Sequence, residues 1–145
     1  MKNCIDITLS ILHCGVHHKV ATLAIDGKDL AARFLEKLLH DDRNQWKFIK
    51  TRIITVSNYE RYENTITFRH LEDGLYEFKR PGLRLYAFYD TIEDTDHLII
   101  CTNGGTKNTK KAQSEDIRKA LERKQRYFEA KSFPHAKFTI NDPIP

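Results

Sequence analysis

The sequence has few of the features that mark a membrane-bound, secreted or disulfide-stabilised protein. No apolar run in its 145 residues approaches the roughly 20 residues of a membrane-spanning helix. The three cysteines, Cys4, Cys14 and Cys101, are an odd number, which does not make a disulfide framework and favours a reducing compartment. Polar residues interrupt the N-terminal apolar positions, so there is no signal-peptide core. We therefore expect a cytoplasmic protein that does not enter a membrane.

The common enzyme motifs are also missing. There is no P-loop, no glycine-rich dinucleotide motif, no nucleophile elbow and no HExxH pair. Cys14, His17 and His18 supply half of a zinc site at most, and adjacent histidines on a strand point to opposite faces. Cys101 lies in an apolar run, where cysteine is usually a small buried hydrophobic residue. We expect neither a metal nor a cofactor.

What is present is the composition of an ordinary folded chain with an uneven distribution of charge. Apolar residues make up 40% and charged residues 30%, so we expect one domain over residues 1–145. The net charge is only +4, but residues 104–126 hold eight basic residues against three acidic ones. Such an excess suits a nucleic acid or an acidic protein, although a solvated helix face would show a similar count. The basic residues of this segment are Lys107, Lys110, Lys111, Arg118, Lys119, Arg123, Lys124 and Arg126.

The N-terminal half shows strand periodicity followed by helix periodicity. Apolar and polar residues alternate over residues 5–11, and residues 20–25 are β-prone, so an extra segment at 1–19 adds a strand before the rest. Asp26 is a candidate N-cap for a helix with Leu30, Phe34, Leu35 and Leu38 on one face. A second helix is predicted after Asp41 and Asp42, because apolar residues repeat at helical spacing from Trp46 to Val56. Together they make an αα-hairpin.

The C-terminal half is predicted to be a run of antiparallel strands and one helix. Pro81-Gly82 joins residues 75–80 to 83–90 as a hairpin, and residues 97–102 form a buried central strand. A helix begins near Ser114 with Ile117, Leu121, Lys124 and Phe128 on its buried side, and the tail at 131–145 is irregular. The predicted class is α+β: an antiparallel sheet, an N-terminal αα-hairpin packed on it and a C-terminal helix.

Basic residues are expected to converge near the hairpin. Lys79, Arg80 and Arg84 lie beside the Pro81-Gly82 turn, and the predicted central strand ends in a lysine-rich loop. Side chains from neighbouring strands and this loop can face one phosphate group. Two other interpretations stay open: Arg84 forms an ion pair with Glu77, and Lys110 and Lys111 belong to a solvated helix start.

These segments resemble a known family. LEDGLYEFKRPGLRLYAFYD, LIICTNGGTKNTKKAQ and the charged helix that follows are similar, in order and spacing, to the RelE/ParE toxin superfamily and especially to its HigB-like, phage-derived branch. The resemblance covers about residues 20–130. It implies a RelE-like fold and the toxin of a type II toxin–antitoxin system. Such a toxin cleaves mRNA, usually in the ribosomal A site, and a small antitoxin encoded beside it neutralises it.

The resemblance also assigns roles to individual residues. Lys79, Arg84 and Lys107 match the family's catalytic basic positions, and Lys110 and Lys111 fall in its lysine-rich loop. We expect Lys110 and Lys111 to bind RNA, together with Arg80, which is next to Lys79. The family's tyrosine near the start of the last helix has no counterpart, and Tyr86, Tyr89 and Tyr127 are the candidates to replace it.

Several functions fit this pattern. RNA cleavage through its own 2′-hydroxyl requires alignment and stabilisation of negative charge, which Lys and Arg supply, and Lys79 between other cations is a candidate general base. A ParE-like toxin that inhibits gyrase would keep the fold without nuclease chemistry. The missing tyrosine would also suit a non-catalytic nucleic-acid-binding relative.

Overall fold

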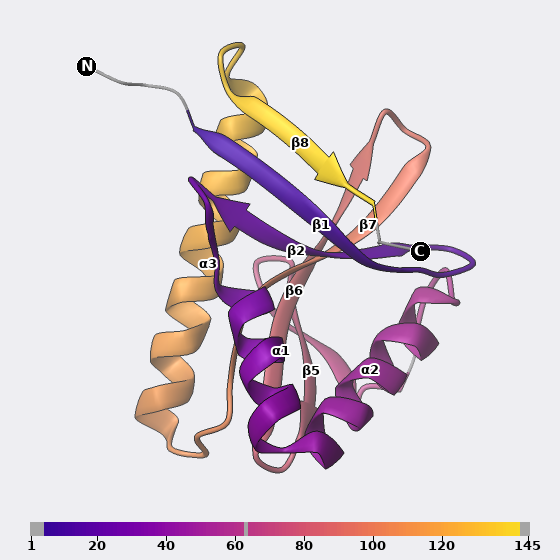
Figure 1. The fold of residues 1–145 in the computed structure, drawn as a ribbon, viewed down its shortest axis with the longest axis vertical. Helices are drawn as coiled ribbons and strands as arrows, with labels where there is room; N and C mark the ends of the chain where they lie inside the picture. Colours follow the sequence, from indigo (N-terminus) through magenta and orange to yellow (C-terminus); the bar gives the residue numbers. More distant parts are fainter. Residues whose placement is uncertain (1–4, 63, 143–145) are drawn as a thin grey trace.

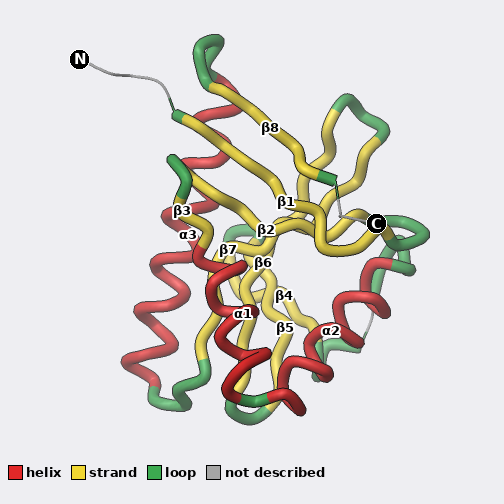
Figure 2. Tube along the Cα trace, in the orientation of Figure 1, coloured by secondary structure: helices red, strands yellow, loops and turns green. Residues whose placement is uncertain are grey.

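The protein consists of one β-sheet with helices against both of its faces (Figure 1). The computed structural model describes residues 5–62 and 64–142, so Cys4, Pro143 and Pro145 lie outside the described residues. Figure 2 shows the strands in yellow between the helices in red. The elements within the described ranges are β1 (Asp6–Cys14), β2 (Lys19–Ile25), β3 (Lys28–Asp29), α1 (Leu30–Asp41), α2 (Arg43–Ser57), β4 (Phe68–Glu72), β5 (Leu75–Arg80), β6 (Leu83–Ile92), β7 (Asp96–Gly105), α3 (Lys110–Ser132) and β8 (Lys137–Asn141).

The sheet is mixed, and this corrects the predicted fold class. Its strand order is β4-β5-β6-β7-β2-β1-β8, with β3 paired to β2 off this path. The pairs β2–β7 and β1–β8 are parallel, whereas the other strand pairs are antiparallel. The prediction of a RelE-like antiparallel sheet was wrong, because the described chain builds eight strands and joins them in both directions. Tight turns signal antiparallel neighbours, but parallel partners lie far apart in the sequence and carry no such signal.

The C-terminal segment corrects a second prediction. Residues 131–145 were expected to be irregular, but α3 continues to Ser132 and β8 follows it. β8 pairs in parallel with β1, from Asp6 opposite Lys137 to Ser10 opposite Asn141. The strand expected in the segment 1–19 is present as β1, and β8 lies along its outer edge (Figure 1).

The predicted hairpin between residues 75–80 and 83–90 is present as β5 and β6. Pro81 and Gly82 form the turn, and Gly82 has a φ of +76°, a left-handed value that glycine adopts without strain. β7 lies in the middle of the sheet, and its residues from Leu98 to Asn103 are buried, as expected for a central strand.

The two faces of the sheet have separate cores. On one face, which we call the α1/α2 face, Leu35, Ile49 and Ile53 of the helices pack with Leu85 and Ile99 of the strands. On the other, the α3 face, Tyr127 and Ala130 pack with Phe88 and Ile100, while Ala120 packs with Tyr86 and Leu75. Successive strand side chains alternate between these faces, so the position of a residue in this alternation determines whether it packs against α1 and α2 or against α3.

α2 begins after Asp42, as predicted, whereas α1 and α3 begin at residues other than those predicted. Asp29, not Asp26, caps α1 by accepting a hydrogen bond from the Ala32 N–H, and Asp42 caps α2 through the Gln45 N–H. α3 begins at Lys110 with Thr109 as its N-cap, four residues before Ser114. Its buried residues are Ala120, Arg123, Tyr127 and Ala130, whereas Phe128, expected inside, is 37% exposed. No helix within the described ranges is long and apolar enough to cross a membrane.

Candidate nucleic-acid interface

Lys79 and Arg84 face each other across the β5–β6 hairpin. The register pairs Lys79 with Arg84 and Glu77 with Tyr86. Because Tyr86 packs against α3, strand alternation puts Glu77, Lys79 and Arg84 on the α3 face as well. Arg84 is also paired with Gly105 at the end of β7. The two strand residues assigned to catalysis are therefore brought together, on one face and at one end of the sheet.

A buried carboxylate lies beside this pair. Glu77 is only 2% exposed, and its Oε1 atom is 3.5 Å from Nε of Arg84. Its Oε2 atom accepts a hydrogen bond of 2.7 Å from Nε of Arg69 on β4. The ion pair between Arg84 and Glu77 that the sequence left open is thus present, and the Arg84 side chain is only 16% exposed. We call Arg69, Glu77, Lys79 and Arg84 the Glu77 cluster.

Arg69 is a residue that the sequence analysis missed. It lies directly opposite Glu77 in the β4–β5 pair. The Asp73-Gly74 turn between them, with φ values of 48° and 75°, signals a hairpin, but the register shift between His70 and Glu72 means that the turn alone does not place Arg69 opposite Glu77.

Arg80, predicted to bind RNA with Lys79, lies on the opposite face. Its guanidinium carbon is 4.4 Å from the ring centroid of Phe48 on α2, a cation–π contact on the α1/α2 face. Neighbouring residues of a strand point in opposite directions, so Lys79 and Arg80 do not share a ligand at this hairpin. Of Arg80 and Arg84, the two cations expected beside Lys79, only Arg84 therefore lies on the same face of the sheet.

The predicted lysines beyond β7 are exposed at the start of α3. Lys107 lies in the connecting loop, and Lys110 and Lys111 are the first two residues of the helix. A helix N-terminus already carries partial positive charge, and lysines there raise the local positive potential further. They also take positions at which acidic residues would usually stabilise the helix. No acidic residue occupies the first turn of α3. This end of the helix favours an anion.

Lys107 also borders a pocket of mixed charge. The pocket has a volume of about 580 Å³ and lies between α1, the Gly82 turn and the beginning of α3. Carboxylates outnumber lysines along its wall, so its interior is a poorer phosphate site than the outer surface of the α3 N-terminus. The charged lining residues are Lys37, Asp41, Asp42, Lys107, Glu115 and Asp116.

Asp116, one of the carboxylates of this pocket, has a raised pKa. Burial raises the pKa of its side chain, nearby Glu115 raises it further, and Lys119 and Lys107 act in the opposite direction. A Cβ atom at Gly105 would come too close to the Asp116 carboxylate, which would then have to move from its present position. Asn103 donates a hydrogen bond of 3.1 Å to the Asp116 carbonyl oxygen and further fixes α3 here.

Replacing Asp116 with asparagine should therefore stabilise the protein at neutral pH. A carboxyl whose pKa is raised in the folded state favours folding while protonated, and this contribution is lost as pH rises above the ordinary 3.8 through the raised value. Thermal unfolding of wild type and Asp116→Asn from pH 3 to pH 8 should give curves that separate across this window, with the variant higher at pH 7. Parallel curves would contradict this assignment.

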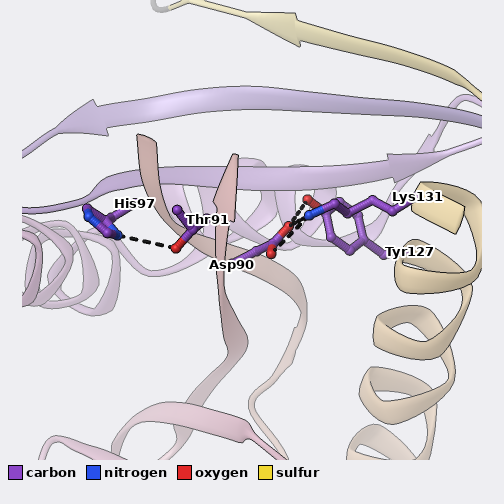
Figure 3. Close-up of polar contacts among 5 residues, drawn as sticks. All are labelled: Asp90, Thr91, His97, Tyr127 and Lys131. Atoms are coloured by element: carbon purple, nitrogen blue, oxygen red, sulfur yellow. Dashed lines mark hydrogen bonds and ion pairs between the residues drawn. The ribbon is translucent and has the colours of Figure 1, made fainter. Parts of the chain in front are cut away.

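None of the three candidate tyrosines offers its hydroxyl to a ligand at the Glu77 cluster. Tyr86 is on the correct face but fully buried under α3, and burial together with Glu77 raises its pKa. Tyr89 points to the α1/α2 face, where burial raises its pKa to about 12. Tyr127 donates a hydrogen bond to Asp90, which also contacts Lys131 at 2.9 Å (Figure 3). The contacts of Tyr127 and Lys131 with Asp90 join α3 to β6, so Tyr127 has a structural role.

The described histidines and cysteines give no alternative centre. His18 is buried between Tyr89 and His97, with ring centroids 5.2 and 6.3 Å away, and burial lowers its pKa. Cys101 is fully buried and burial raises its pKa, which disfavours a reactive thiolate. Among the residues that the structure describes, no three His, Cys, Asp or Glu side chains are grouped in a way that could hold a metal ion.

No family model, no curated protein and no solved structure matches this chain.

Proposed function

We propose that this protein is a cytoplasmic endoribonuclease toxin of a type II toxin–antitoxin system, which holds an RNA phosphate with Arg84, Lys79 and Lys107. The observation that carries the proposal is the direct pairing of Lys79 with Arg84 beside Glu77. Glu77 contacts the arginine at Nε, which leaves its terminal nitrogens available for a phosphate oxygen. The resemblance of residues 74–111 to the RelE/ParE toxins supports the same choice of ligand.

The chemistry that this arrangement supplies is positioning and charge stabilisation. In the proposed reaction the RNA 2′-hydroxyl gives its proton to solvent and its oxygen attacks the adjacent phosphorus, the bond from phosphorus to the 5′-oxygen breaks, and that oxygen takes up a proton from solvent. The product is a 2′,3′-cyclic phosphate. Negative charge grows on the phosphate oxygens during attack, and fixed guanidinium and ammonium groups stabilise that charge more than they stabilise the starting RNA.

The proposal also names partners. A protein antitoxin, encoded beside the toxin, would cover the cationic face, and the ribosome would present the mRNA. Lys110 and Lys111 at the α3 N-terminus extend the positive surface from Lys107 and would contact RNA phosphates outside the reacting nucleotide. No cofactor or metal is assigned a step.

Induced expression followed by primer extension tests the proposal. We expect growth arrest and discrete cuts in cellular transcripts within minutes of induction, concentrated in translated codons. Arrest with intact transcripts and damaged DNA would instead indicate gyrase inhibition. Expression that neither arrests growth nor cuts RNA would point to a non-catalytic nucleic-acid-binding protein. Either of the last two results overturns the endoribonuclease assignment.

A further inference from the structure

Arg69 lies in the Glu77 cluster but outside the proposed catalytic set. Its Nε atom is 2.7 Å from Glu77 Oε2, closer than the 3.5 Å between Arg84 Nε and Oε1. The Arg69 side chain is 45% exposed, against 16% for Arg84 and 2% for Glu77. A single buried carboxylate therefore joins an arginine that is largely sheltered to one that projects into solvent.

The charge of the cluster exceeds what Glu77 requires. One cation would neutralise a buried carboxylate, but both Arg69 and Arg84 contact Glu77, and Lys79 lies two residues further along the same face of β5, so these four side chains carry a net charge of +2. Both arginines reach Glu77 through Nε, and their terminal nitrogens have no hydrogen-bond or ion-pair partner among the described residues. Each arginine thus keeps the planar pair of N–H donors that suits two phosphate oxygens.

The strand register sets where these side chains leave the backbone. Arg69 on β4 is opposite Glu77 on β5, and Lys79, two residues further along β5, is opposite Arg84 on β6. Neighbouring strands are about 4.8 Å apart, so the backbones of β4 and β6 are separated by roughly 10 Å. Despite this separation, both Nε atoms meet the one carboxylate of Glu77, which occupies the point where the two guanidiniums could share a ligand, so each arginine has its terminal nitrogens for a phosphate of its own.

We propose that Arg69 forms a second phosphate-binding subsite, for a phosphate of the same RNA strand next to the one held by Arg84, and that Glu77 is the positioning residue that couples the two arginines. This inference rests on the proposed function, because it takes RNA as the ligand. It assigns the edge strand β4 to substrate binding and directs the RNA across β6, β5 and β4.

The salt dependence of RNA binding measures how many phosphate contacts the protein makes. The probe is an eight-nucleotide single-stranded RNA with 2′-O-methyl groups, which cannot be cut through its 2′-oxygen, and binding to the full chain is followed by fluorescence anisotropy. Each phosphate contact adds about 0.7 to the slope of log affinity against log salt for single strands. Arg69→Gln should lower this slope by about 0.7 and weaken binding about tenfold at low salt, while Arg69→Lys should restore most of the slope.

Arg118→Gln is the matched control, because it removes one positive charge from an exposed α3 arginine whose partner is Glu122. Its slope should stay at the wild-type value. If Arg69→Gln binds like Arg118→Gln while Arg84→Gln is weakened, the second subsite is refuted and the proposed function stands. If wild type does not bind the RNA, the second subsite is refuted, and the primer-extension experiment decides the proposed function separately.

Glu77→Gln tests the positioning role separately. The change removes a negative charge, so charge alone would make RNA bind more tightly. Loss of the shared carboxylate releases both guanidiniums, so positioning predicts weaker binding, by about tenfold, despite the added net positive charge. Circular dichroism at the temperature of the assay establishes that the variant is folded. Tighter binding by a folded Glu77→Gln protein would overturn the coupling.

Discussion

Replacing Arg84 with alanine is expected to lower the rate of RNA cleavage at least about 100-fold and to relieve growth arrest, while the protein stays folded. Removing one fixed donor to the charge that develops in a transition state typically costs a factor of about 10²–10³. Folding should be little affected, because Glu77 keeps its shorter contact of 2.7 Å to Arg69. The measurements are growth after induction, cleavage of a defined transcript and thermal unfolding of the purified variant.

Two further variants sharpen this result. Arg84→Lys retains the positive charge but not the planar pair of donors, so its activity should lie between wild type and alanine. Arg118→Ala removes an arginine that is 72% exposed on α3, and it should cleave RNA at the wild-type rate. A folded Arg84→Ala protein that arrests growth as wild type does would remove Arg84 from the proposed site.

The part of the site that could be predicted depends on one short turn. Pro81-Gly82 sets the register of the β5–β6 hairpin, and that register pairs Lys79 with Arg84. The same two-residue period also excludes Arg80 from this group, since adjacent strand residues point apart. Grouping Arg80 with Lys79 therefore overlooked information that the sequence already contained.

Other contacts depend on structure that leaves no local mark. The register of β4 against β5 shifts between His70 and Glu72, and such a bulge changes which residues share a face, so the side of Arg69 could not be read from alternation. The parallel pairs β2–β7 and β1–β8 join segments without a connecting turn. The mixed sheet and the Arg69–Glu77 contact both arise at this level.

The run of basic residues at 104–126 shows how a charge count can mislead. Lys107, Lys110 and Lys111 are exposed, as a nucleic-acid surface requires. Arg123, in the same run, is 6% exposed, and its terminal nitrogen donates to the carbonyl oxygens of Leu23 at 3.1 Å and Lys28 at 2.7 Å. This arginine connects α3 to the end of β2 and to β3, so it contributes to folding rather than to ligand binding.

Arg123→Ala should accordingly lower the free energy of unfolding by about 3 kcal/mol, through loss of two charge-assisted hydrogen bonds and of buried packing. Burial lowers the pKa of this arginine, the sign of a desolvation cost that offsets part of its contribution, so Arg123→Met, which keeps the apolar stem, should lose less than alanine. Urea denaturation gives these values.

The matched control is Arg126→Ala, three residues further along α3, where the side chain is 43% exposed and 3.5 Å from Asp26. Its loss should be within about 1 kcal/mol, as is usual for a surface ion pair. RNA binding at a temperature where all variants are folded should be unchanged in Arg123→Met, in contrast to Arg84→Gln. Equal stability of Arg123→Ala and Arg126→Ala would contradict the structural role, and weaker RNA binding by folded Arg123→Met would return this residue to the interface. The basic residues of α3 thus divide by burial into those that hold the helix to the sheet and those that can meet an anion.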